Sequence, residues 1–415
     1  MLYYTVSYFV KDKQYYKFCT YGFLKNLRFY DAFLLLFFLE NGISYSQIGL
    51  LYAVREFTII FSEVPTGIIA DTYGRKKSLI VSFLAYIISF LVFYYSKNFS
   101  VLIIAIVLNG IGDAFRSGTH KGMIFDYLKL NHWESHKINY YGHTRSWSQK
   151  GSAISALFAG FLVLYSGSYR VIFLFSIIPY LLNFINVFTY PNTLNFSLEE
   201  KEAHEQKSFA AVFKRFFSVI KKRNVFQIIN SSALHSAFLK AIKDYIQPVM
   251  VQIAMLLPLL KTLEPKRKSG LVIGVIYFFI FLLASFASRL AFKISSLSVK
   301  NIPNVTLIVG LAAGVLCGLF INNAFWVLAL VSFISIYMIE NARKPILTAM
   351  IADQVSTKII TSVLSAQSLY STFVTSILAL LIGIIADNYG VGIALTSVSV
   401  LLILITVFVY NFKRD

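Results

Sequence analysis

The sequence has little of what soluble enzymes and disulfide-rich domains are built from. Only 14% of its 415 residues are charged, against about 25% in an ordinary soluble domain. Its two cysteines, Cys19 and Cys317, lie far apart, so we expect neither a disulfide framework nor a Cys/His metal site. The sequence also lacks a G-x-S-x-G motif and a P-loop, which excludes a hydrolase of that kind and a self-contained ATP-driven pump. We therefore predict no enzyme activity, no cofactor and no metal.

What the sequence has instead is long hydrophobic runs. Hydrophobic residues make up 57% of the chain, and its mean hydropathy is +0.68. Runs of about 20 apolar residues recur, and each can cross a hydrocarbon core of ~30 Å as a helix. They are too long and too continuously apolar for barrel strands, the other structure that satisfies its backbone in lipid. We predict an all-α polytopic membrane protein with twelve transmembrane helices in two groups of six, at 21–41, 45–71, 77–97, 99–128, 138–165, 169–190, 224–257, 269–294, 303–322, 324–352, 361–387 and 390–411.

The distribution of the positive charge predicts the orientation in the membrane. The net charge is +19, and most Lys and Arg outside the spans fall on the side that carries both termini. The positive-inside rule then places both termini in the cytoplasm of a cell membrane, the inner membrane if the source is Gram-negative. The basic cluster at 261–268 departs from this rule, and the sequence offers no account of it. We attribute the excess charge to topology and to attraction by anionic lipid, and we expect no nucleic-acid partner.

One long polar connection divides the chain. It predicts an N-terminal six-helix bundle at 1–190, a cytoplasmic linker at 191–223 and a C-terminal six-helix bundle at 224–415. The second part of the linker is basic and amphipathic, so we expect it to lie along the membrane surface. The octapeptides GIIADTYG at 67–74 and GIIADNYG at 383–390 differ at one position. They are consistent with inverted repeats within each half, or with chance convergence on a helix-end pattern.

The loop after the second span reads GIIADTYGRKK at 67–77. Gly67 is expected to let two helices approach closely, and Gly74 to permit a tight turn at positive φ. Asp71 is placed to pair with a basic group or with the N-terminus of a neighbouring helix. The basic residues that follow Gly74 hold the loop at the cytoplasmic face.

This loop resembles the signature G-x-x-x-D-R-x-G-R-R/K of the major facilitator superfamily, and it stands in the expected place after the second of twelve spans. Thr72 stands where the family usually has Arg. The resemblance extends to the six-plus-six layout, the central linker and the internal termini. It implies two pseudo-symmetric bundles and transport by alternating access, with the first, fourth, seventh and tenth helices lining a central cavity. It also implies a gating role for the loop residues Gly67, Asp71, Gly74, Arg75 and Lys76.

Charged residues within the spans are the candidate functional residues. Each charge at a helix centre costs roughly 2.5–3.5 kcal/mol on insertion scales, so it must face a cavity or another charge. Helical spacing groups these residues into stripes on the first, fourth, seventh and tenth spans. The candidates for substrate binding and coupling are Arg28, Asp31, Asp113, Arg116, His120, Lys240, Lys243, Asp244, Glu340 and Arg343.

The fourth span carries the clearest stripe, which runs from Asn109 through Asp113 and Arg116 to His120. In the seventh span, Asp244 is expected beside Lys240, one helical turn away. Two interpretations remain open for such charges: they line a cavity, or they form salt bridges within each half and snorkel at helix ends. We favour the second for Asp126, Lys150, Asp353 and Asp387.

The sequence thus predicts a secondary active transporter of a small solute. Proton coupling is expected through Asp31, Asp113 or Glu63, with His120 as a further candidate because imidazole titrates near neutral pH. The basic residues on central helices suggest an anionic substrate such as a carboxylate or a siderophore. The alternatives are an efflux pump for drugs and other amphipathic compounds, which the aromatic content of 16% favours, and a non-transporting receptor. The expected partners are the solute, membrane lipids and H+, and we expect a monomer.

Overall fold

The structure, a computed structural model, describes residues 9–195, 223–258, 262–295, 302–354 and 360–411. Within these ranges the chain is helical and contains no strand. The first half consists of α1 (Lys13–Lys25), η1 (Phe29–Ala32), α2 (Leu34–Glu40), α3 (Tyr45–Tyr73), α4 (Arg75–Tyr95), α5 (Phe99–Arg116), α6 (Thr119–Leu130), η2 (Glu134–His136), α7 (Lys137–Ser166), α8 (Val171–Phe188) and η3 (Asn192–Leu194). The second half consists of α10 (Arg223–Ile242), α11 (Gln247–Leu256), α12 (Pro265–Ser295), α13 (Ile302–Asn322), α14 (Trp326–Gln354), α15 (Ile360–Tyr389) and α16 (Val391–Asn411).

The helices follow the twelve predicted spans, but three of those spans are broken. The first comprises α1, η1 and α2, the fourth comprises α5 and α6, and the seventh comprises α10 and α11. In the part of the chain that the structure describes, eight helices are long and apolar enough to cross a membrane. The first helix of the first span begins at Lys13 rather than at residue 21, so that Cys19 lies inside it. The prediction of a first span that starts after Cys19 is therefore wrong.

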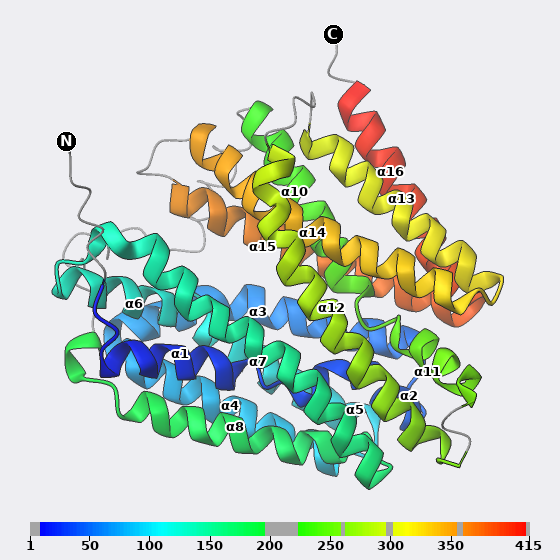
Figure 1. The fold of residues 1–415 in the computed structure, drawn as a ribbon, viewed down its shortest axis with the longest axis horizontal. Coiled ribbons are helices and arrows are strands. Elements are labelled where there is room, and N and C mark those ends of the chain that lie inside the picture. The colour runs from blue at the N-terminus through cyan, green and yellow to red at the C-terminus, as the bar shows by residue number, and fades with distance from the viewer. Residues whose placement is uncertain (1–8, 196–222, 259–261, 296–301, 355–359, 412–415) are drawn as a thin grey trace.

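The halves are arranged as two groups of helices, the first (blue to blue-green and green, α1 to α8) below and the second (light green to red, α10 to α16) above and to the right in Figure 1. Between them, α7 packs along α12 and α3 packs along α15. We call the end of the molecule where α1 begins, α8 ends and α10 begins the terminal face. The opposite face carries the connections at 41–44, 167–170 and 323–325.

Two glycine crossings hold the halves together. A Cβ atom on Gly383 would lie 3.0 Å from the Cα of Gly49, and one on Gly274 would lie 2.8 Å from the Cα of Gly160. Small residues let helix backbones approach closely in lipid, where packing rather than hydrophobicity drives association. Gly67 is not at such a crossing, because no neighbouring atom of the described residues lies within 4 Å of where its Cβ would be. The predicted close approach at Gly67 is wrong, and the close approach of α3 occurs at Gly49.

The loop at 67–77 forms the predicted tight turn. Gly74 adopts φ +105° between α3 and α4, which confirms the expected positive φ. The backbone N–H of Arg75 donates to the carbonyl oxygen of Asn195 at 2.6 Å. The side chain of Arg75 pairs with Asp126, and the Lys76 amine donates to the Tyr190 carbonyl oxygen at 2.9 Å. These contacts fasten the loop to α6 and to the segment that follows α8.

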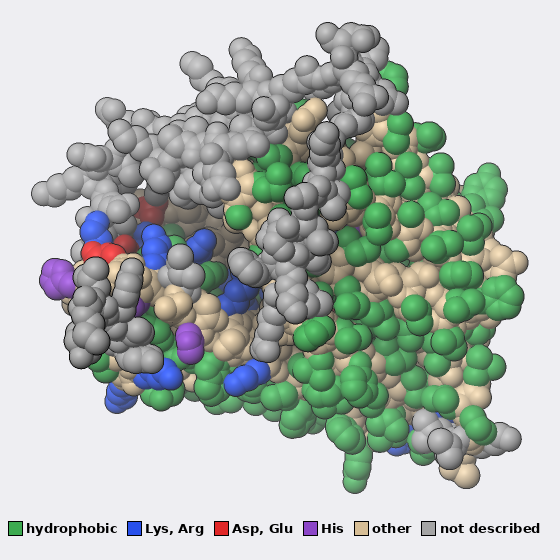
Figure 2. Space-filling view, turned by 45° about the horizontal axis from the view of Figure 1, so that its top comes forward, with side chains coloured by type: hydrophobic (Ala, Val, Ile, Leu, Met, Phe, Trp, Pro, Cys, Tyr) green, Lys and Arg blue, Asp and Glu red, His purple; other side chains and the backbone are tan. Residues whose placement is uncertain are grey.

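The outer surface is rich in large apolar side chains, as a lipid-facing surface requires. Exposed examples include Phe161, Ile185, Phe286, Leu328 and Phe408. Hydrophobic side chains cover the right of the space-filling view in Figure 2. The basic amphipathic segment predicted in the linker lies outside the described residues, and the bounds of the two halves and the linker remain a prediction.

Candidate functional site

A cavity of about 700 Å³ lies between the two halves. Its walls come from α1, α3, α5, α6 and α7 of the first half, and from α10 and α15 of the second. It extends toward the terminal face, where Lys121 and Tyr141 line it. Figure 2 shows this side of the molecule hollowed, with Lys and Arg side chains in the hollow.

The cavity wall carries twice as many cationic as anionic side chains. Eight basic residues line it: Lys25, Arg28, Arg55, Arg116, Lys121, Arg145, Lys240 and Lys243. Four carboxylates line it: Asp31, Glu56, Asp113 and Asp244. Seven of the ten residues predicted from sequence as candidates are charged residues of this wall, and His120 lines it as well.

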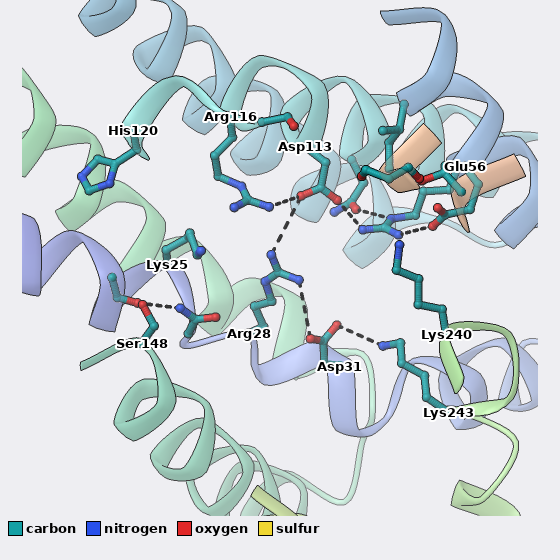
Figure 3. Close-up of a pocket in the computed structure, with 18 of the residues that line it drawn as sticks. Lys25, Arg28, Asp31, Glu56, Asp113, Arg116, His120, Ser148, Lys240 and Lys243 are labelled. Carbon is teal, nitrogen blue, oxygen red and sulfur yellow. Dashed lines mark hydrogen bonds and ion pairs between the residues drawn. The ribbon is translucent and has the colours of Figure 1, made fainter. Parts of the chain in front are cut away.

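Asp113 on α5 is the centre of the densest ion-pair network. Its Oδ2 pairs with Arg55, and its Oδ1 lies 2.6 Å from Arg116 and 3.9 Å from Arg28. The Tyr86 hydroxyl also donates to it. Figure 3 shows the guanidinium groups of Arg28 and Arg116 pointing toward Asp113. The predicted proximity of Asp113 and Arg116 is confirmed, and the charge of Asp113 is compensated from three helical segments.

Arg55 on α3 is a site residue that the stripe analysis did not select. Its guanidinium bonds Asp113, Asn109 at 3.1 Å and Glu56 at 2.9 Å. The sequence marked Arg55 only as a charged residue within the second span. It was not selected because it is not part of a polar stripe. Its partners are more than fifty residues away, on α5, except for the adjacent Glu56.

A second row of charges crosses from one half to the other. Arg28 lies 3.8 Å from Asp31, Asp31 lies 3.9 Å from Lys243, and Lys243 lies 3.4 Å from Asp244. The prediction that Asp244 pairs with Lys240 is wrong. Because α10 ends at Ile242, Asp244 is not one helical turn beyond Lys240, and its partner is Lys243.

The same break brings Gln247 to the broken first span. The Gln247 side chain is fully buried. Its carbonyl oxygen accepts from the backbone N–H groups of Leu35 and Leu36 at 3.2 and 3.3 Å. Its amide donates to the carbonyl oxygen of Asp31 at 3.1 Å. The start of α2, whose first N–H groups lack partners within the helix, is therefore bonded by a side chain of the second half.

His120 lies on the cavity wall but not on the helix that carries Asp113. Its ring stacks on Tyr21 with centroids 3.4 Å apart, and its Nε2 is 3.2 Å from the Tyr190 hydroxyl. Gly118 has φ +72° and separates α5 from α6. The predicted continuous stripe is therefore wrong at its last step, since Arg116 and His120 belong to different helices.

Glu340 and Arg343 on α14 are not among the residues that line the cavity. Glu340 is 2.7 Å from Nδ1 of His235 and also accepts from Ser236. Arg343 donates to the carbonyl oxygens of Pro303 at 2.9 Å and Ser231 at 3.0 Å. The two residues therefore join α10, α13 and α14 inside the second half, and sequence spacing did not identify their partners. This placement corrects the expectation that they face the central cavity.

Four cations on the cavity wall have no carboxylate partner among the described residues: Lys25, Lys121, Arg145 and Lys240. They come from α1, α6, α7 and α10, so they stand on both halves. The amine of Lys121 lies over the rings of Phe125 and Tyr141 at 5.5 Å. Figure 3 shows Lys25 and Lys240 on different sides of the Asp113 network. These groups are available to a ligand.

The opposite face is closed by contacts between the halves. Lys266 pairs with Glu40, and the guanidinium of Arg267 donates to the carbonyl oxygens of Leu164 and Tyr165 at 2.9 and 2.6 Å. These contacts give a structural role to the basic cluster at 261–268, for which the sequence offered no account; Lys261 lies outside the described residues. Asp387 accepts from the N–H groups of Tyr45 and Ser46 at 3.1 and 3.3 Å. The placement of Asp387 at a helix end, bonding a neighbouring helix, agrees with the structural interpretation.

The predicted gating residues lie away from the cavity wall. Gly67, Asp71, Gly74, Arg75 and Lys76 are not among its lining residues. The contacts of Arg75 and Lys76 join the turn between α3 and α4 to α6 and to the segment that follows α8, as described above. The pairing of Arg75 with Asp126 agrees with the interpretation of Asp126 as a structural charge.

Comparison with known proteins gives one family. Residues 23–368 match the family model described as Major Facilitator Superfamily. An uncharacterized MFS-type transporter of Bacillus subtilis, YxaM, is 32% identical over 85 residues, which are 20% of this chain and 21% of the relative. The sucrose permease of Escherichia coli is 33% identical over 127 residues, 29% of each chain. These matches thus span less than a third of either curated relative.

Solved structures share the fold over nearly the full chain. The nucleoside transporter NupG superposes with a TM-score of 0.71 at 16% identity, covering 97% of both chains. The D-xylose-proton symporter superposes with a TM-score of 0.65 at 13% identity, covering 96% of both chains. At such identities the likeness concerns the fold alone.

Proposed function

The chain belongs to the Major Facilitator Superfamily, and from that premise we propose that it carries a small organic anion across the membrane by alternating access, coupled to protons. The family and the relatives that match are transporters, which places the chain among multi-pass membrane transporters. The anion, the coupling ion and the orientation are our proposals.

The excess of cations on the cavity wall carries this proposal. The four carboxylates of the wall are paired with Arg28, Arg55, Arg116 or Lys243. The other four cations of the wall have no such partner in the described part of the chain: Lys25, Lys121, Arg145 and Lys240. Cations within a membrane protein are costly unless compensated. A bound carboxylate or phosphate would supply that compensation, with the planar guanidinium of Arg145 suited to bidentate contacts.

The proposed orientation follows from the positive-inside rule. It makes the terminal face cytoplasmic, so that the cavity opens to the cytoplasm while the opposite face is sealed. The contacts of Lys266, Arg267 and Asp387 would then form the extracellular seal. Rocking of the halves about the site would open that seal and close the cytoplasmic side.

If the substrate is an anion, the cations of the cavity wall that have no carboxylate partner should determine the affinity for it. With purified protein, a thermal-shift screen that pairs each anionic metabolite with a neutral analogue should yield anionic hits. Arg145→Gln and Lys240→Gln should each weaken binding of those hits about tenfold, a loss of ~1.4 kcal/mol, because each removes an uncompensated charge. Lys150→Gln is the control, since Lys150 is exposed on the same helix as Arg145 and does not line the cavity. Hits confined to neutral amphipathic compounds, with both variants binding normally, would favour the efflux alternative.

Among the predicted coupling carboxylates, we favour Asp31. Its contacts with Arg28 and Lys243 are long, 3.8 and 3.9 Å, and its side chain is 34% exposed. A proton can reach such a carboxylate through the cavity. Asp113 has closer partners on all sides. Glu63 accepts from Ser117 at 3.4 Å and is not a lining residue.

Asp31→Asn should therefore abolish accumulation driven by a pH gradient in proteoliposomes but retain exchange of labelled for unlabelled solute. Exchange needs alternating access without net proton movement, so the two assays separate coupling from folding. The exposed Glu134→Gln should behave as the unmodified protein in both. Normal gradient-driven accumulation by Asp31→Asn would exclude Asp31 as the coupling group.

A further inference from the structure

Arg28, Asp31, Lys243 and Asp244 form the row of charges that joins the halves, which we call the charge row. A second, smaller cavity lies against it. Its volume is about 190 Å³, and it shares Asn26, Arg28, Asp31, Lys243 and Asp244 with the large cavity. We call it the inner chamber. Its other walls come from η1, α7, α12 and α14. The charge row therefore has the large cavity on one side and the inner chamber on the other.

The walls of the inner chamber combine aromatic rings with hydroxyl groups. Tyr277 and Phe281 of α12 present rings 6.1 Å apart at 25°, and Tyr337 of α14 completes the aromatic part. Ser152 and Ser155 of α7 supply hydroxyls. The Tyr277 hydroxyl donates to the carbonyl oxygen of Lys243 at 3.3 Å, which fixes that ring beside the charge row. Rigid rings and small polar side chains are typical of sites that bind organic molecules.

Two polar groups on the chamber wall lack partners. Ser155 is buried, with 4% of its surface exposed, and its Oγ has no hydrogen-bond partner in the ranges that the structure describes. Nε of Arg28 is likewise without a partner there, although the terminal nitrogens of that guanidinium pair with Asp31 and Asp113. Buried polar groups in folded proteins are ordinarily bonded, and exceptions at a cavity wall indicate a missing ligand or water. Ser155 and Arg28 both line the inner chamber, and that cavity has room for a ligand or a water molecule.

We propose that the inner chamber binds a hydroxylated ring, so that the transported anion is a sugar acid or a sugar phosphate. This rests on the proposed transport of an anion. A dry cavity of about 150 Å³ holds a benzene molecule, so 190 Å³ accommodates one six-membered ring and its substituents. The C–H faces of the ring would pack on Tyr277 and Phe281. Its hydroxyls would bond Ser155 and Arg28, and its anionic group would reach the cations of the large cavity.

The hydroxyl preference distinguishes this proposal from anion binding in general. A site that must bond substrate hydroxyls leaves its own buried groups unpaired when they are missing, and such sites discriminate strongly. A purely electrostatic site would bind a hydroxylated and a plain ring carboxylate equally well. Ser155 should therefore affect only the first of these ligands, whereas Phe281, which packs on the C–H faces of a ring, should affect both.

The test measures binding by the purified full-length protein of three probes: glucuronate, cyclohexanecarboxylate and glucose. We expect glucuronate to bind at least tenfold more tightly than either of the other two. Ser155→Ala should weaken glucuronate binding about tenfold and leave cyclohexanecarboxylate binding unchanged, whereas Phe281→Leu should weaken the binding of both. Ser146→Ala is the control, since Ser146 is exposed on the same helix and lines neither cavity.

The outcomes separate the two proposals. Equal binding of glucuronate and cyclohexanecarboxylate, or normal glucuronate binding by Ser155→Ala and Phe281→Leu, would overturn the inner chamber as a sugar site but leave anion transport standing. If glucose bound as tightly as glucuronate and the chamber variants weakened that binding, the result would support the inner chamber as a sugar site. The same result would overturn the proposal that the substrate is an anion. No binding of any probe would overturn the inner chamber as a sugar site, and the thermal-shift screen of anionic metabolites would then decide the anion proposal by itself.

Discussion

Replacing Gln247 with leucine is expected to lower the transport rate at least tenfold and to loosen the seal at the opposite face. The leucine side chain cannot accept from the N–H groups of Leu35 and Leu36, nor donate to Asp31. Each buried group left without a partner costs about 1–3 kcal/mol, and ~1.4 kcal/mol is a tenfold change in an equilibrium. Because Gln247 belongs to the second half and its partners to the first, the cost falls on the state in which this face is closed.

The seal can be followed with a single reporter thiol. Ser269 is buried on α12, where its hydroxyl is 2.9 Å from that of Tyr169 in the other half. In a chain whose two native cysteines are replaced, Ser269→Cys should react slowly with a membrane-impermeant maleimide. Adding Gln247→Leu should speed that reaction severalfold, because the opposite face opens more often.

Two further variants show whether the bonds or the volume of the side chain matter. Gln247→Glu keeps an acceptor for Leu35 and Leu36 but loses the donor to Asp31, so an intermediate effect is expected. Gln252→Leu is the matched control, because Gln252 is exposed on the same helix. Equal labelling and transport in Gln247→Leu and Gln252→Leu would show that the bonds to α2 do not hold the seal.

Changing Asp113 to asparagine is expected to abolish both gradient-driven accumulation and solute exchange, with a lower thermal stability. The substitution leaves Arg55, Arg116 and Arg28 clustered without their common counter-charge. Removing one member of a buried ion pair costs about 3–5 kcal/mol. We therefore expect a structural defect rather than a selective loss of proton coupling.

A charge-balancing second change tests this explanation. Asp113→Asn combined with Arg55→Gln should recover part of the thermal stability lost by Asp113→Asn, since one cation leaves with the carboxylate. Exposed Glu134→Gln is the control for a surface carboxylate. If Asp113→Asn instead retained exchange and lost only gradient-driven accumulation, Asp113 rather than Asp31 would be the coupling group.

Hydrophobic length allowed the spans to be predicted because it is a local property. A run that can cross a bilayer is visible residue by residue, so the helices begin and end within a few residues of the predicted bounds, apart from the start of the first. The breaks were harder to predict. Gly118 at φ +72° gave a possible signal in the fourth span, and Pro248 at the start of α11 gave one in the seventh, but the start of α2 depends on Gln247 from the other half.

The charges show the same division between local and distant information. The spacing of Asp113 and Arg116 identified one face of one helix, and the structure confirms that they pair. Spacing could not select Arg55, whose partner on α5 is 58 residues away, nor could it identify Lys25 as a residue of the cavity wall. It also assigned Glu340 to the cavity, whereas His235 and Ser236 bind it within the second half.

By itself, the sequence determined a twelve-span helical transporter with a signature turn at Gly74 and an excess of positive charge. These features follow from hydropathy, glycine conformation and residue counts, which need no knowledge of neighbours. Only the tertiary structure decided which charges compensate one another and which stay free at the cavity. That outcome depends on the rotation of each helix and on the points at which helices break, and both are set by packing between segments far apart in the chain.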